Sequence, residues 1–170
     1  LAMGINGQST LVETNKTKLR SNGVVVSALA GSKKVGLGLR YKSLYEIQNV
    51  FKVGWGGGLD SYSSNLERRF IPVTLEVVGD LFVDKATPYY MVSAGYGLTL
   101  KEDESFAINA SGGVTVDISI GYRAKKTTVQ PFVALGYRIQ HAFYNGLDDW
   151  GYEDKDVVYK RWSFSLGTFF

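Results

Sequence analysis

The sequence predicts an all-β protein, an eight-stranded antiparallel up-and-down transmembrane β-barrel, from three observations. Eight segments alternate between large apolar residues and small or polar residues, which is typical of strands with two different faces. The connections alternate between short turns and mostly longer loops, as periplasmic turns and extracellular loops do in membrane barrels. Many of the 20 glycines lie on the polar faces, and glycine there suits a crowded interior or a sharply bent strand.

The first four expected strands occupy the N-terminal part of the chain. Residues 22–32 (NGVVVSALAGS) are expected to form the first strand, although their pattern does not assign its faces. In residues 35–44, valine, leucine and tyrosine alternate with glycine, arginine and lysine. Residues 50–61 alternate phenylalanine, valine, tryptophan and leucine with lysine, glycine and aspartate. In residues 70–83, isoleucine, valine and leucine oppose threonine, glutamate and aspartate.

The last four expected strands repeat the pattern. Residues 88–100 alternate tyrosine, valine, alanine and leucine with smaller or more polar residues, and residues 113–124 oppose valine and isoleucine to threonine, aspartate and serine. Residues 129–143 place valine, leucine, tyrosine and isoleucine opposite glutamine, alanine, glycine and arginine. Residues 157–170 (VVYKRWSFSLGTFF) place a large apolar set opposite a mostly small or polar set. Strands of about 10 residues match a tilted crossing of the hydrocarbon layer.

Two classes of connection separate these strands. The short class contains YEIQN, VDKATP and KKTT, and the longer class contains SYSSNLERR, KEDESFAINAS and the loop over residues 144–156. The first connection, GSKK, is short where a long loop is expected. The rest of the series predicts turns at one end of the barrel and loops at the other.

Side-chain volume predicts which face points outward. The interior of an eight-stranded barrel is only just wide enough for its side chains, so about five large apolar residues from every strand would not fit inside. The apolar faces are therefore expected to point outward, and a continuous exposed apolar belt of this kind suits lipid. The alternative is a soluble β-sandwich, which also has alternating strands, but it would leave the glycines without a use and bury the tyrosines.

The composition excludes several classes of site. Cysteine is absent and His141 is the only histidine, so neither thiolate nor multi-histidine metal sites are expected, and no cofactor is predicted. The net charge of +3 comes without a basic stripe, which argues against nucleic acid as a partner. No apolar run approaches the ~20 residues of a membrane helix.

The chain shows neither repeats nor an internal domain boundary, and we divide it into three parts. Residues 1–8 (LAMGINGQ) are interpreted either as a signal-peptide remnant or as a frayed terminus. Residues 9–18 are expected to form a polar periplasmic tail, and residues 19–170 the outer-membrane β-barrel.

Charged residues on the polar faces predict an ion-pair network in the lumen, since an unpaired buried charge is costly. The predicted members are Arg40, Lys52, Glu76, Asp80, Asp117, Arg123, Arg138 and Arg161. We expect Glu76, Asp117, Arg138 and Arg161 to form a central cluster. We expect Asp80 to lie with Lys52, Arg123 and Arg40 nearer the periplasm. The preferred interpretation is a structural plug, and the alternative is a gated ion path.

The alternating strands and the final WSFSLGTFF resemble the small eight-stranded outer-membrane proteins of the OmpA and OmpX type, over roughly residues 19–170. This resemblance implies the outer membrane of a Gram-negative bacterium, with its lipid and lipopolysaccharide as surroundings. It also implies that the barrel-assembly machinery reads Trp162, Phe164 and Phe170 as its signal.

His141 raises an enzymatic alternative, since lipid A deacylases are eight-stranded outer-membrane barrels with a lipid-facing histidine and a serine two residues later. Here the residue two positions beyond His141 is Phe143, and the candidate acids Asp148 and Asp149 lie in the expected last loop. Because a nucleophile must lie within reach of its base, the triad is incomplete. We therefore predict no catalytic residues.

The last loop is the strongest candidate for recognition. It combines Asp148 and Asp149 with Trp150 and Tyr152, and aromatic anchors recur at binding hot spots. A protein or glycan partner is expected there, and outward-facing Lys160 is placed to contact lipopolysaccharide phosphate. The sequence thus predicts a non-enzymatic outer-membrane barrel with a salt-bridge-filled lumen, structural or partner-binding through its loops. A lipid A hydrolase and a narrow gated pore are the alternatives.

Overall fold

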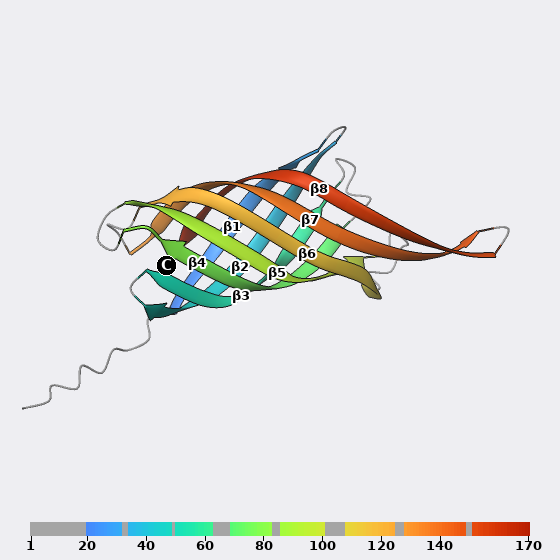
Figure 1. Cartoon of the computed structure of the whole chain (residues 1–170), viewed down its shortest axis with the longest axis horizontal. Coiled ribbons are helices and arrows are strands. Elements are labelled where there is room, and N and C mark those ends of the chain that lie inside the picture. Colours follow the sequence, from blue (N-terminus) through green and yellow to red (C-terminus); the bar gives the residue numbers. More distant parts are fainter. Residues whose placement is uncertain are drawn as a thin grey trace, which may run out of the picture.

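The computed structural model describes residues 20–31, 34–48, 50–62, 69–82, 86–100, 108–124, 128–148 and 151–170. They form a closed antiparallel barrel in which every strand pairs with its chain neighbours and the last pairs with the first (Figure 1). The strands are β1 (Arg20–Ala30), β2 (Val35–Gln48), β3 (Phe51–Ser61), β4 (Arg69–Asp80), β5 (Thr87–Leu100), β6 (Ile108–Arg123), β7 (Gln130–Asp148) and β8 (Gly151–Phe169). The predicted fold class, an all-β eight-stranded antiparallel up-and-down barrel, is confirmed.

The described residues contain no helix that is long and apolar enough to cross a membrane. The predicted segments 1–8 and 9–18 lie outside the described residues, so the division of the N-terminus remains a prediction.

All eight predicted strands are present, and the observed strand limits differ most from the predicted limits at the last hairpin. Pairing between β7 and β8 continues to Asp148 and Gly151, so most of the expected loop over residues 144–156 is strand. Figure 1 shows this β7–β8 hairpin projecting beyond the other strands. Likewise, β2 continues through most of the expected turn YEIQN. Backbone pairing between antiparallel neighbours needs no apolar face, so alternation underestimates the length of such strands.

The first strand, whose faces the sequence did not assign, closes the barrel. β1 pairs with β8 from Gly23 opposite Phe169 to Ala30 opposite Trp162. At the end of the seam, the backbone N–H groups of Asn22 and Phe170 each donate to the other residue's carbonyl at 2.8 Å. A Cβ atom on Gly23 would overlap the ring of Phe169, so the absence of a side chain there lets the ring lie across the seam.

The two faces of the wall are those the volume argument predicts. On β8, Trp162, Phe164 and Phe170 are 59%, 51% and 53% exposed on the outside, whereas Ser163, Ser165 and Phe169 are buried inside. We call the end of the barrel that contains Arg20 and Phe170 the termini end, and the opposite end, from which β7 and β8 project, the hairpin end.

Candidate functional site: a layered lumen

Ion pairs fill the middle of the lumen. Arg138 on β7 donates from Nε to Oδ2 of Asp117 on β6 at 2.6 Å, and its Nη1 lies 3.0 Å from Oδ1 of Asp60 on β3. Asp60 also accepts hydrogen bonds from the guanidinium of Arg40 on β2. These four side chains are buried, with Asp60 fully inaccessible. Two arginines and two carboxylates thus form a single chain of pairs across four strands.

A second pair extends this layer. Lys42 donates from Nζ to Oε2 of Glu76 at 2.6 Å, and the hydroxyl of Thr74 donates to the other carboxylate oxygen at 2.7 Å. Together the six charged residues form the central ion-pair layer, namely Arg40, Lys42, Asp60, Glu76, Asp117 and Arg138. Their buried formal charges balance at three positive and three negative.

Glycines on the same face make room for these charges. A Cβ atom on Gly38 would overlap the Asp60 carboxylate, and one on Gly56 would overlap the Glu76 carboxylate. At these two inward glycines, the missing side chain therefore leaves room for a carboxylate of the ion pairs.

A separate ion pair lies at the termini end. Arg123 on β6 is fully buried, and its Nη2 donates to both carboxylate oxygens of Asp80 on β4. Its guanidinium carbon lies 5.6 Å from the ring centroid of Tyr89 and 5.4 Å from that of Phe169. Cation–π contacts of this kind strengthen when water is excluded, so the rings support the pair.

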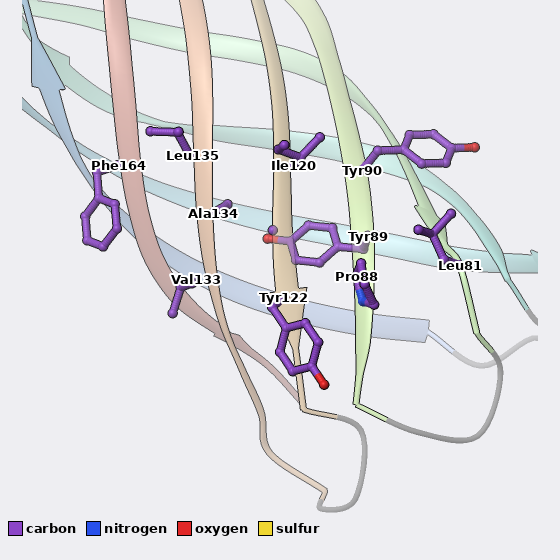
Figure 2. Close-up of a pocket in the computed structure, with 11 residues that line it drawn as sticks. Leu81, Pro88, Tyr89, Tyr90, Ile120, Tyr122, Val133, Ala134, Leu135 and Phe164 are labelled. Atoms are coloured by element: carbon purple, nitrogen blue, oxygen red, sulfur yellow. The ribbon is translucent and has the colours of Figure 1, made fainter.

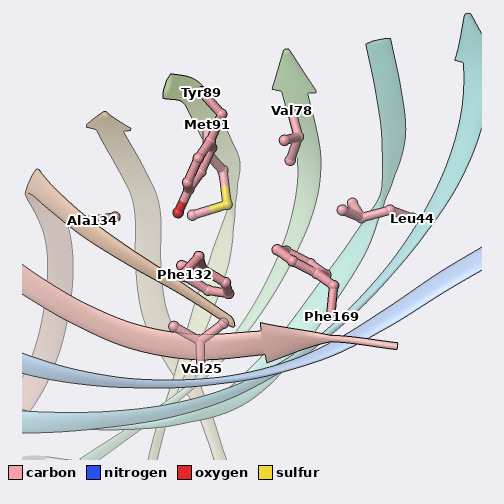
Figure 3. Packing of buried hydrophobic residues seen from close by; sticks show 8 residues of the cluster. All are labelled: Val25, Leu44, Val78, Tyr89, Met91, Phe132, Ala134 and Phe169. Carbon is pink, nitrogen blue, oxygen red and sulfur yellow. The ribbon is translucent and has the colours of Figure 1, made fainter. Parts of the chain in front are cut away.

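Those rings belong to an apolar cluster that closes the termini end, shown in Figure 3. The ring of Phe132 stacks on that of Phe169 at 5.0 Å and meets that of Tyr89 edge-on at 5.8 Å. The termini-end plug consists of Val25, Leu44, Val78, Tyr89, Met91, Phe132, Ala134 and Phe169. Lys42 reaches its inner surface, with Nζ 3.2 Å from the sulfur of Met91.

A second apolar cluster closes the hairpin end. Tyr62, Phe70 and Tyr159 meet in a triangle with ring centroids 5.1 to 5.8 Å apart. With Leu29 and Ala142 they form the hairpin-end plug. The lumen is thus layered, with charges in the middle and rings at both ends. The sequence predicted only the charges, because these aromatic residues come from four strands and from the residue that follows β3, and they converge only when the barrel closes.

The observed partners differ from the expected grouping in several places. Arg138 and Asp117 do meet, as do Arg123 and Asp80. Glu76 pairs with Lys42 instead of joining Arg138, and Arg40 pairs with Asp60 instead of Asp80.

The remaining two predicted members are Lys52 and Arg161. Lys52 lies 4.0 Å from the Glu46 carboxylate. Arg161 donates to the carbonyl of Tyr62 at 3.5 Å, nearer the hairpin end than expected. Strand tilt and stagger set the height of each side chain in the lumen, and neither can be counted from sequence spacing.

His141 has an acidic partner that sequence analysis did not select. Its Nδ1 lies 3.6 Å from Oδ1 of Asp156 on the neighbouring strand, with both side chains more than a third exposed. Phe143 occupies the position of the serine in the resembled deacylases, and its ring lies 6.4 Å from the imidazole. The geometry therefore supplies a base and a carboxylate, with an unreactive ring at the position of the nucleophile.

The predicted recognition and assembly residues that the structure describes lie on the outer face or in the β7–β8 hairpin. Asp149 and Trp150 are outside the described residues, and of Asp148 and Tyr152 only the strand backbone is described. Trp162 packs edge-on against Tyr137 at 5.2 Å on the outer face. Within the described ranges, no group of three histidine or acidic side chains is arranged to hold a metal ion.

The comparisons with known proteins support the fold. A scan against protein-family models and a search of curated proteins gave no match to this sequence. Among solved structures, the N-terminal β-barrel domain of Pseudomonas aeruginosa OprF aligns with a TM-score of 0.52 and 10% identity, covering 88% of this chain and 97% of that chain. Neisserial surface protein A (NspA) aligns with a TM-score of 0.55 and 14% identity, covering 88% and 94%. Both are small outer-membrane eight-stranded barrels, so this chain shares their fold.

Proposed function

We propose that this protein is a non-enzymatic barrel of a Gram-negative outer membrane that displays the β7–β8 hairpin to a protein or glycan partner. The observation that carries the proposal is a contrast within the molecule. The lumen is occupied along its length by buried side chains, whereas β7 and β8 continue beyond the other strands. A filled barrel acts as an anchor, and the projecting hairpin is the part placed to meet other molecules.

The hairpin has two properties suited to recognition. Residues 144–156 contain five acidic residues and one lysine, so this segment carries a clear negative charge. Among the described residues, pairing between β8 and β1 stops at Trp162, so residues 151–161 extend beyond the last β1 partner on that side. An open strand edge can accept an extended segment of another chain through backbone hydrogen bonds. A basic extended segment is the protein partner that fits this edge best.

Two further partners belong to the proposal. Trp162, Phe164 and Phe170 are exposed on the closing strand, where the barrel-assembly machinery would read them. Lys160 is exposed on the same strand beyond Trp162, in a position suited to a lipopolysaccharide phosphate.

The orientation can be tested by single-cysteine labelling, because the sequence contains no cysteine. Glu153→Cys lies in the hairpin and Thr128→Cys lies near the termini end. On intact cells, a membrane-impermeant maleimide should label the Glu153→Cys protein, and it should label Thr128→Cys only after permeabilisation. Labelling of both variants on intact cells, or of neither, would contradict the proposed topology.

The partner role can be tested by shortening the hairpin. Replacement of residues 144–155 by Asn-Gly, a turn that suits a two-residue hairpin, should retain a heat-sensitive shift on gels while abolishing crosslinking to the cell-surface partner. A crosslinking pattern identical to that of the unaltered protein would exclude the hairpin as the docking element.

The two alternative functions have direct tests. A gated pore would show large steady conductance in planar bilayers, whereas a plugged anchor should show little. A lipid A hydrolase would remove an acyl chain from lipid A, and His141→Ala would stop that loss. The contact of His141 with Asp156 is the observation that keeps the second test worthwhile.

A further inference from the structure

The outer wall of the barrel contains an apolar groove at the termini end, shown in Figure 2. Its volume is about 630 Å³, within the range of small-molecule sites. The lining comes from β5 to β8 and from the residue that follows β4, and it consists of Leu81, Pro88, Tyr89, Tyr90, Ile120, Gly121, Tyr122, Val133, Ala134, Leu135 and Phe164. Carbon atoms therefore form almost the whole surface.

Large outward side chains form the walls of the groove. Ile120, Leu135 and Phe164 are 68%, 52% and 51% exposed on the outer face. Gly121 faces inward between Ile120 and Tyr122, and a Cβ atom there would meet the ring of Tyr89 and the methyl group of Ala134 on the inner side of the wall. The Tyr89 ring of the termini-end plug thus lies directly behind the floor, as Figure 2 shows.

The rim at the termini end is held in place. The Tyr122 hydroxyl donates to the carbonyl of Ala86 at 3.2 Å, which links the end of β6 to the connection before β5. Tyr90 lies over Gly79, where a Cβ atom would overlap its ring. These contacts fix the positions of the rim residues, so the groove is formed before a ligand binds and its side chains need not rearrange.

We propose that this groove binds one acyl chain of a glycerophospholipid as a resident lipid. The inference rests on the proposed membrane location, which gives the groove direct contact with hydrocarbon. The groove is continuous with the exposed apolar belt, and its wall of aromatic and aliphatic carbon suits an alkyl chain.

The surroundings select the class of lipid. The groove lies at the termini end, opposite the proposed cell-surface side, so it faces the leaflet that holds phospholipid. The rings of Tyr90 and Tyr122 at the rim suit the interface between headgroups and hydrocarbon.

Native mass spectrometry of the full chain tests the proposal. The protein is purified in mild detergent and exposed separately to phosphatidylglycerol, phosphatidylethanolamine and lipid A. We expect one phospholipid to remain bound per barrel after detergent removal. Ile120→Ala with Leu135→Ala should lower the walls and abolish this retention. Leu37→Ala with Leu39→Ala removes the same kind of exposed side chain from β2, away from the groove, and should leave retention unchanged.

Several outcomes would overturn the inference. They are equal loss of lipid from both double variants, preferential retention of lipid A, a dimer in place of a lipid adduct, and a folded barrel that retains no phospholipid. Heat-shift gels of each sample confirm that the barrel is folded. Because the assay uses purified protein and defined lipids, a negative result leaves the hairpin proposal standing. If the cysteine-labelling test failed, the argument that the groove faces the phospholipid leaflet would be lost. A measured retention of phospholipid would still stand.

Discussion

The middle of the lumen and its two ends are filled by opposite chemistry. The central ion-pair layer contains six charged side chains that pair with one another, whereas the two plugs contain mainly rings and aliphatic side chains. Apolar ends keep water away from the middle, which lowers the dielectric around the charges and raises the cost of leaving one unpaired. The two apolar plugs therefore determine how much stability is lost when a charge of the central ion-pair layer has no partner.

The largest effect is expected from Arg138→Leu, which removes the residue that joins Asp60 and Asp117. Two buried carboxylates would lose their shared partner, and breaking a buried pair in this way costs about 3–5 kcal/mol. Urea unfolding in detergent micelles or vesicles would measure the change. Arg161→Leu is the matched control, because Arg161 is partly exposed and its hydrogen bond to the carbonyl of Tyr62 is long at 3.5 Å, so the loss of stability should be much smaller. Equal effects would show that the central layer is well hydrated.

Phe169→Ala tests the apolar end and should cost about 3 kcal/mol, since removal of a buried phenylalanine side chain leaves a cavity. The ring contacts Phe132 and lies across Gly23 at the closure seam. Phe170→Ala, one residue away but 53% exposed on the outer face, provides the control. In the same lipid, Phe169→Ala should lower the free energy of unfolding clearly more than Phe170→Ala does. A larger loss of stability from Phe170→Ala would contradict the role of Phe169 in the termini-end plug.

Variants of the Lys42–Glu76 pair test whether stability depends on the presence of the charges or on their being paired. Glu76→Leu alone should destabilise by about 2–3 kcal/mol, because it leaves a buried lysine without its carboxylate. The double variant Lys42→Met with Glu76→Leu should recover most of this loss, since apolar residues can replace a buried pair at little cost. A double-mutant cycle from urea unfolding would measure the coupling. If adding Lys42→Met to Glu76→Leu did not recover stability, these two charges would stabilise the barrel through contacts beyond their own pair.

The smallest effect is expected outside the lumen, at His141→Ala. The contact with Asp156 is long and exposed, and pairs of this kind contribute about 0–1 kcal/mol. Unfolding free energies of the variant and the unaltered protein should agree within that range. A loss above about 2 kcal/mol would show that the base of the hairpin depends on this pair more than its exposure suggests.

The sequence predicted the strands well and the partners inside the lumen less well. Alternation identified all eight strands, and the volume argument correctly turned Trp162, Phe164 and Phe170 outward. The pairing of Arg40 with Asp60, and of Glu76 with Lys42, depended on strand register and tilt, which alternation does not contain. No prediction brought Tyr62, Phe70 and Tyr159 together, since nothing in their spacing signals a shared plug.

The final strand shows where the two kinds of information divide. By itself, the sequence of residues 157–170 determined that one face is apolar and the other small or polar, because side chains alternate along any strand. It also determined that the bulky face must point outward, because a narrow barrel has no volume for it.

Only the tertiary structure decided what lies opposite each inward residue. Closure places the ring of Phe169 over Gly23, and it brings the side-chain hydroxyl oxygens of Ser165 and Ser27 to 2.7 Å from each other. Both contacts join residues that are 138 or more positions apart in the sequence. Such contacts depend on the closed register of the whole sheet. The apolar plugs, the central charges and the outer groove over Tyr89 all follow from that register.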